Sequence, residues 1–248
     1  MPGAASRPTR CETCPLKSLE VFRAVTPQEL AFIDSLKSGE FATETGTTVL
    51  LEGSSSPHLY TVLSGWAFRY KTLEDGRRQI LNVVLPGDFL GLQSSMMNEM
   101  QHSVESLTPM VLCVFPRAKL WELYASHPSL AYDLTWLAAR SERLLDENLL
   151  SVGRRSASER IAYMLLDIFL RARHIGLTKG ASLALPLSQQ HVADALGLSL
   201  VHTNRTLKSL LQRRLFRWKA GILEILDEPG LAIVANYPGS LPVLRPLI

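Results

Sequence analysis

The sequence of 248 residues has only three cysteines and no apolar run long enough to cross a membrane. A membrane-spanning helix needs roughly 18 or more consecutive apolar residues. Three cysteines do not form a disulfide framework, and the first 14 residues, MPGAASRPTRCETC, lack the apolar core of a secretory signal. These absences predict a cytoplasmic protein with no membrane partner.

Acidic side chains are scarce in the C-terminal part of the chain. Residues 154–248 contain 13 lysines and arginines but only 6 aspartates and glutamates, whereas residues 1–153 contain 13 and 17. The net charge of +3 therefore conceals a basic C-terminal part, as expected of a module that binds a polyanion. The length allows two compact domains.

Histidines are also few, and their spacing argues against an enzyme. A cupin-like barrel enzyme needs two or three histidines and a carboxylate on neighbouring strands. His58 and His102 stand alone in the sequence, and neither they nor His127 have a spacing that indicates a haem. We expect no catalytic site, and a cupin-like enzyme is the weakest alternative.

The apolar pattern changes several times along the chain. TPQELAFIDSL predicts a short helix with Thr26 as its N-cap and Glu29 completing a capping box. Short β-type runs follow from about residue 38 to 116, separated by the turn signals EGSSSP, EDGR and LPGD, which predicts an antiparallel β-roll. The predicted division is a Cys-containing leader (1–25), a β-roll sensor domain (26–127), a dimerisation helix (128–153), a winged helix–turn–helix (154–229) and a tail (230–248).

Leucines recur at steps of three and four in the long helix predicted from Pro128. The apolar stripe is narrow, as in a two-helix seam, so we expect a homodimer that forms through this helix. The alternative is a helix that packs on its own roll. The residues predicted at the dimer interface are Leu130, Leu134, Leu137 and Leu144.

The stretch HVADALGLSLVHTNRTLKSLL contains two short amphipathic runs separated by Gly197. Ser188 is placed to cap a helix over 189–196, and Ser199 to cap a second helix that ends near Arg213. RLFRWKAGILEIL then predicts a hairpin that turns at Ala220–Gly221. The fold class is therefore α+β, with an N-terminal roll, a long helix and a C-terminal winged helix–turn–helix.

The second helix presents a row of polar groups on its outer side. Arg205 can bond bidentately to guanine, Asn204 can pair with adenine, and Lys208 lies where a phosphate contact is expected. A plain helical hairpin with a solvated polar face is the alternative. The residues of this outer side that are predicted to contact DNA are Val201, His202, Asn204, Arg205 and Lys208.

From about residue 11 to 230 the chain resembles the Crp/Fnr superfamily of bacterial transcription regulators. The matching stretches are SGWAFRYKTLEDGRRQILNVVLPGDFLG, ASERIA and LPLSQQHVADALGLSLVHTNRTLKSL. The resemblance implies a homodimer on a palindromic DNA site, and RNA polymerase as a partner if the protein is an activator. It also implies that Arg205 reads a base, that Lys208 contacts the backbone, and that Ser199 and Gln189 lie near phosphates.

Val201 departs from the family pattern, which has an acidic residue at this position. A carboxylate accepts a hydrogen bond from cytosine, whereas valine can only contact a thymine methyl group. The resemblance therefore implies a half-site that differs at this base pair. His202, beside it, adds a contact of its own or is merely exposed.

The cyclic AMP cassette of the family is not intact. The family's ribose-binding glutamate is replaced by Leu92, and its phosphate-binding Arg-Ser pair by His102 and Ser103. Without an arginine the bidentate clamp on phosphate is missing, and a histidine offers only a weak, pH-dependent substitute. We do not expect cyclic AMP to bind, and the effector stays open.

Cys11, Cys14 and Cys113 resemble three of the four cysteines that hold a [4Fe–4S] cluster in the oxygen-sensing Fnr branch. The fourth position falls on Glu20, a harder ligand than a thiolate. The alternatives are a thiol or other metal sensor, an effector unrelated to cysteine, and a constitutive regulator whose roll is only a dimerisation scaffold. A buried structural Cys113 beside a relic Cys-x2-Cys also fits.

Overall fold

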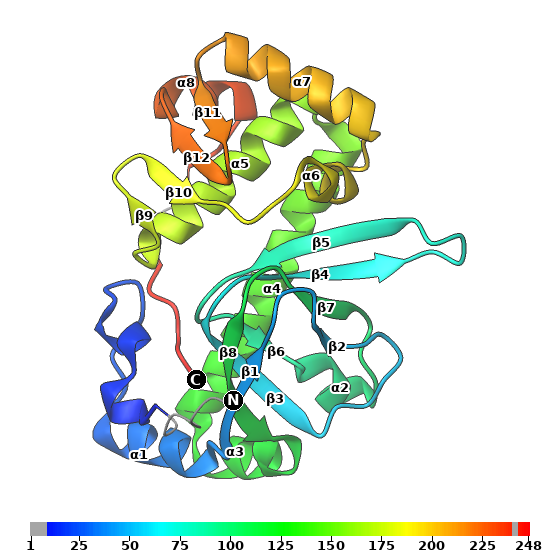
Figure 1. The fold of residues 1–248 in the computed structure, drawn as a ribbon. Helices are drawn as coiled ribbons and strands as arrows, with labels where there is room; N and C mark the ends of the chain where they lie inside the picture. The colour runs from blue at the N-terminus through cyan, green and yellow to red at the C-terminus, as the bar shows by residue number, and fades with distance from the viewer. Residues whose placement is uncertain (1–8, 240–242) are drawn as a thin grey trace, which may run out of the picture.

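The computed structural model describes residues 9–239 and 243–248 and confirms the α+β architecture (Figure 1). A β-roll forms one half of the molecule, and a helical module with a small sheet forms the other. The long helix α4 (Pro128–Arg154) runs beside the roll and leads into the C-terminal module. None of the helices in the described residues is long and apolar enough to span a bilayer.

Two four-stranded antiparallel sheets make the roll. One has the order β1 (Gly39–Thr43), β8 (Met110–Pro116), β3 (His58–Ser64), β6 (Phe89–Leu90). The other has the order β2 (Thr48–Leu50), β7 (Ser103–Ser106), β4 (Ala67–Thr72), β5 (Arg78–Val84). A short helix, α2 (Leu92–Met97), follows β6. The space between the sheets is filled by buried apolar side chains, among them Val62, Ala67, Leu90, Met100, Val104 and Leu112.

The leader lies against the roll. It forms two 3-10 turns, η1 (Cys11–Thr13) and η2 (Pro15–Ser18), before α1 (Pro27–Leu36). The predicted capping box is confirmed, because Thr26 accepts from the Glu29 amide and Glu29 accepts from the Thr26 amide. Glu29 also accepts from the Ser129 hydroxyl at 2.6 Å, which fixes α1 to the first turn of α4.

The first half of α4 packs on its own roll, after η3 (Arg117–Lys119) and α3 (Leu120–Ser126). Leu130 and Leu134 are fully buried and Leu137 is 6% exposed, so these three cannot face a partner. The prediction that they form a dimer interface is wrong, and the alternative of a helix packed on its roll holds for this half. Leu144 is half-buried beside a cavity. The exposed leucines of α4 are Leu145, Leu149 and Leu150.

The C-terminal module confirms the two predicted helices of the helix–turn–helix and their caps, Ser188 and Ser199. Its helices are α5 (Ala157–His174, capped by Ser156), α6 (Gln189–Leu196), α7 (Leu200–Gln212) and α8 (Glu228–Ala235). Its sheet has the order β11 (Phe216–Lys219), β12 (Ile222–Ile225), β10 (Ser182–Ala184), β9 (Thr178–Lys179).

Helix α8 was not predicted. Its residues 230–235 were predicted to belong to the tail. Asp227 caps α8 by accepting from the Gly230 amide at 2.9 Å, and Pro229 lies in the first turn, where its missing N–H costs nothing. Leu231 and Ala235 are buried in the core that includes α5. The tail therefore begins after α8.

One apolar core joins the roll to the C-terminal module. It contains Phe68 and Ile80 from the roll together with Ile161, Leu165 and Phe169 from α5. The two halves are therefore packed together, and the position of the helix–turn–helix is set by the roll beneath it.

Candidate nucleic-acid interface

The helix–turn–helix is built from short-range hydrogen bonds. Ser188 accepts from the His191 amide at 3.2 Å, and the His191 ring accepts from the Ser188 amide at 3.1 Å. Gly197 has a φ of +63°, a left-handed conformation that ends α6 and lets the chain turn. Ser199 then accepts from the His202 amide at 3.2 Å and starts α7. These bonds set where α6 and α7 begin, and Gly197 sets where α6 ends.

One face of α7 is buried and the other is exposed to solvent. Thr203, Leu207 and Leu210 are at most 3% exposed and pack toward α5 and α6. Val201, on the opposite side, is 71% exposed. The residues predicted to contact DNA are all exposed: Gln189, Ser199, Val201, His202, Asn204, Arg205 and Lys208.

The structure gathers most of the predicted α7 residues around one shallow hollow. Ser199, Val201, His202 and Arg205 line it, and so does Ser158 at the start of α5. Asn204 and Lys208 lie outside this hollow on the same exposed helix. The Arg205 guanidinium can donate two hydrogen bonds to a guanine, and Val201 beside it can make an apolar contact with a thymine methyl group. No sequence pattern placed Ser158 at this surface, because the first turn of α5 is far from the helix–turn–helix along the chain.

The wing follows α7 directly. Ala220 and Gly221 both have positive φ, 51° and 75°, as a tight two-residue hairpin turn requires. Arg217 and Glu224 pair across the hairpin at 3.0 Å. A groove between the wing and the start of α6 is lined by Gln189 and Lys219, among others. Gln189 therefore lies beside the wing and not at the hollow that Arg205 lines.

The β4–β5 hairpin of the roll contacts α6, which no sequence pattern indicated. Arg78 lies 3.2 Å from the Asp194 carboxylate, and the Gln79 amide donates to the Ala195 carbonyl at 2.9 Å. The His191 and Phe68 rings meet at a centroid distance of 5.4 Å. The roll therefore touches the helix that supports the recognition helix.

The residues of the altered cassette lie inside the roll. His102 is 7% exposed, and burial together with nearby Arg69 and Lys71 lowers its pKa to about 3. It is therefore neutral near pH 7 and carries no charge for a phosphate, which corrects the expected pH-dependent substitute. Ser103 accepts from the Glu52 amide at 3.0 Å, and Leu92 packs against the apolar core.

The three cysteines come together at one small cavity. Cys11, Cys14 and Cys113 line a cavity of about 50 Å³ beneath the leader, and Glu20 lies at a different, larger cavity. Burial and the Asp34 carboxylate raise the pKa of Cys11 to about 12, and burial raises that of Cys113. In residues 9–239 and 243–248, no three Cys, His, Asp or Glu side chains are placed to hold a metal ion. These donors do not fit a [4Fe–4S] cluster, which needs four thiolates.

A β-roll, a long connecting helix and a helix–turn–helix with an exposed second helix together are the organisation of a DNA-binding regulator. Residues 40–127 match the cyclic nucleotide-binding domain, and residues 159–233 match the Crp-like helix-turn-helix domain. The roll and the helix–turn–helix are thus both found by family comparison.

The relatives that this chain matches over most of its length are regulators. The chain is 32% identical over 228 residues to the nitrogen fixation regulation protein FixK of Bradyrhizobium diazoefficiens, covering 91% of this chain and 93% of FixK. It is 31% identical to the transcriptional activatory protein AadR of Rhodopseudomonas palustris, covering 88% and 90%. The structure of FixK2 from Bradyrhizobium japonicum superposes with a TM-score of 0.72 at 27% identity, covering 79% and 96%. The chain belongs to the Crp/Fnr family of transcription regulators.

Proposed function

We propose that the protein is a homodimeric transcription regulator that binds a palindromic promoter site through α7. The observation that carries the proposal is the exposed polar face of α7, held on a capped and buried helix pair. An α-helix with such a face fits the major groove of DNA. The basic C-terminal part of the chain supplies the attraction to phosphates.

The exposed face of α4 supports dimerisation, with a different set of residues from those first expected. Ala138, Leu145, Leu149 and Val152 fall on one stripe at steps of three and four, with Glu142 between them. Leu149 is 73% exposed and Leu145 is 40% exposed. A second copy of α4 would bury this stripe as in a coiled coil. Two copies of α7 would then lie side by side, spaced for consecutive major grooves.

Base recognition is assigned to the first two turns of α7. Arg205 presents a guanidinium fork for guanine O6 and N7, and Val201 presents a methyl group for thymine. Ser199 accepts from the His202 amide and so keeps its hydroxyl proton for a phosphate oxygen. Lys208 is placed one turn further along, where a phosphate contact is expected.

A signal in the roll, or at the junction of the leader and the roll, would control the DNA-bound state. The roll touches α6 and α4 at once, so a change there can shift the population of dimers whose recognition helices match the DNA spacing. The filled interior of the roll and the neutral His102 argue against cyclic AMP as that signal. AadR is a transcriptional activatory protein, and an activator role of this kind favours RNA polymerase as a partner.

The test is selection of bound duplexes from a random DNA pool with the purified full chain, followed by mass measurement of the complex. We expect an enriched inverted repeat and a complex with two chains. Enrichment of no sequence, or a complex with one chain on a single half-site, would contradict the proposal. A constitutive regulator, the second candidate, would bind equally in aerobic and anaerobic extracts.

A further inference from the structure

Residues 243–248 return from the C-terminal module to the roll. In Figure 1 the red end of the chain passes beside the leader and ends next to the roll. Val243 and Leu244 are each 60% exposed, whereas Arg245 and Ile248 are each 6% exposed. The segment is therefore exposed where it arrives and buried where it ends.

Arg245 fixes the segment by its backbone and by its side chain. Its amide donates to the Val21 carbonyl and its carbonyl accepts from the Arg23 amide, both at 2.9 Å. Its guanidinium lies 2.7 Å from the Asp88 carboxylate and donates to the Gly87 carbonyl at 2.9 Å. It also lies over the Phe22 ring, 5.1 Å from the centroid. These contacts join the leader, the β5–β6 loop and residues 243–248.

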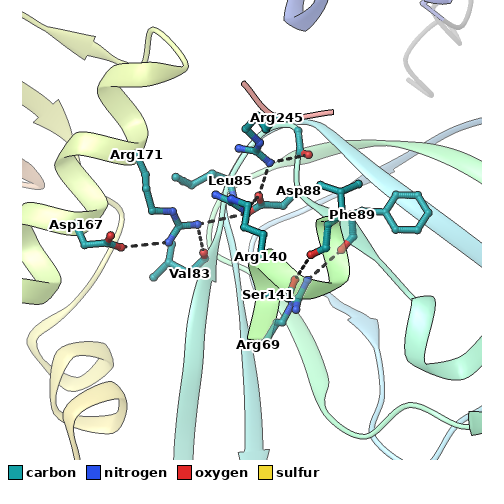
Figure 2. Close-up of polar contacts among 12 residues, drawn as sticks. Arg69, Val83, Leu85, Asp88, Phe89, Arg140, Ser141, Asp167, Arg171 and Arg245 are labelled. Carbon is teal, nitrogen blue, oxygen red and sulfur yellow. Dashed lines mark hydrogen bonds and ion pairs between the residues drawn. The ribbon is translucent and has the colours of Figure 1, made fainter. Parts of the chain in front are cut away.

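Asp88 is shared by three arginines from three parts of the chain (Figure 2). Arg140 of α4 lies 3.0 Å from it, Arg171 of α5 lies 3.4 Å from it, and Arg245 lies 2.7 Å from it. The three guanidinium groups hold the pKa of this buried carboxyl well below its ordinary value, against the opposing effect of burial. One carboxylate thus links the roll, the long helix, the DNA-binding module and residues 243–248.

Beyond Arg245, the segment closes the cysteine cavity. Leu247 and Ile248 line the same cavity as Cys11, Cys14 and Cys113. Ile248 packs in the apolar core around α1 and β8, and its backbone oxygen accepts from the Thr61 hydroxyl. An aliphatic side chain of this chain therefore occupies the space beside the three thiols.

We propose that the cysteine-lined cavity is a receptor for residues 243–248, which act as an intramolecular latch between the DNA-binding module and the sensor roll. Engagement shields the thiols and adds a contact that restrains the module beside the roll; release exposes the thiols and leaves the module held by its other contacts with the roll, the shared apolar core among them. A chemical signal that reaches the cavity must displace Ile248. The effect on DNA rests on the proposed function, whereas the shielding of the thiols does not.

The first test is the rate at which iodoacetamide alkylates Cys113 in the full chain, measured by mass spectrometry. We expect Ile248→Ala to raise this rate at least about tenfold, because a buried side chain that holds the latch is lost. Leu244→Ala removes the same number of carbons from an exposed side chain of the segment and is expected to leave the rate within about twofold. Equal rates in the wild type and in Ile248→Ala would overturn the proposal.

Arg245→Gln tests the other anchor and protects the test against a folding defect, since Arg140 and Arg171 still neutralise Asp88. We expect faster alkylation of Cys113 and faster hydrogen exchange of the Arg23 amide, with an unchanged circular dichroism spectrum. A synthetic peptide of residues 243–248 should slow the alkylation of both variants. Slow exchange and slow alkylation in folded Arg245→Gln would contradict the latch.

The second test measures the affinity of the wild type and of Ile248→Ala for the DNA duplex that was selected with the wild-type chain. Loss of the latch should weaken DNA binding by Ile248→Ala at least about fivefold, because each module is then held by fewer contacts and more of its order must be gained on binding. Unchanged affinity together with faster alkylation would contradict the coupling of the latch to the module. If the wild type selects no duplex, the proposed function fails, and the alkylation rates still decide whether the latch exists.

Discussion

Arg78 of the β4–β5 hairpin lies 3.2 Å from Asp194 of α6, so the β-roll contacts the first helix of the helix–turn–helix directly. The same guanidinium lies 4.8 Å from the centroid of the Phe68 ring and 3.6 Å from Glu105. Asp194 is largely buried at this contact. Any change in the roll that moves the hairpin therefore moves the helix on which α7 is mounted.

Substitution Arg78→Ala should loosen this contact. The side chain is 25% exposed, so we expect a loss of about 1 kcal/mol in the free energy of unfolding of the C-terminal module. Arg77→Ala is the matched control, since Arg77 is 77% exposed and pairs with Asp75. Denaturant unfolding followed by tryptophan fluorescence measures both. Equal midpoints for Arg78→Ala and Arg77→Ala would mean that the contact contributes nothing to stability.

Substitution Leu149→Glu should prevent dimerisation. It places a carboxylate on the exposed apolar stripe of α4, where two copies would bring two like charges together in an apolar seam. We expect a monomer in analytical ultracentrifugation at a concentration where the wild type is a dimer. Ile233→Glu, at an 81% exposed position of α8, is the control and should remain a dimer. A dimeric Leu149→Glu would place the interface elsewhere.

His102 should make the protein sensitive to mild acid. Its pKa is about 3 in the folded chain against an ordinary value of 6.5, so between these values the unfolded chain binds a proton that the folded chain does not. Its contribution to stability is therefore complete above pH 6.5 and is lost as the pH falls toward 3. As the pH falls below 6.5, the wild type should lose up to about 1.4 kcal/mol of its free energy of unfolding per pH unit through this histidine, and His102→Gln should not show that loss.

The measurement is the free energy of unfolding at intervals from pH 6.5 to 5, above the range where most carboxylates titrate. His174→Gln, at an exposed position, controls for the removal of an imidazole. Parallel pH dependences for the wild type and His102→Gln would show that the histidine is charged when folded.

The cysteines should not assemble a [4Fe–4S] cluster. Three thiols, with the pKa of Cys11 raised to about 12 by burial and by Asp34, supply neither the number nor the charge of the ligands required. We expect colourless protein with less than one iron per chain after anaerobic purification. A brown preparation whose colour is lost in Cys113→Ser would contradict this and would require the segment beside the cavity to move.

Local patterns in the sequence were sufficient to predict the helix–turn–helix. Ser188, Gly197 and Ser199 act within a few residues of themselves, so their roles can be read from the chain. The contacts of Asp88 could not be predicted, because its three arginines come from positions 52 to 157 residues away. Leu130 and its neighbours were misassigned because periodicity shows that a stripe is buried but not what covers it.

We propose that α7 reads bases with Arg205 and contacts the DNA backbone with Lys208. Binding of the selected palindrome and of variants at each base pair should be measured over a range of salt concentrations. We predict that Arg205→Ala costs about 1–3 kcal/mol and loses preference at one base pair of each half-site, and that Lys208→Ala weakens all duplexes alike with a shallower salt slope. An Arg205→Ala protein that keeps the wild-type preference at every base pair would contradict the account.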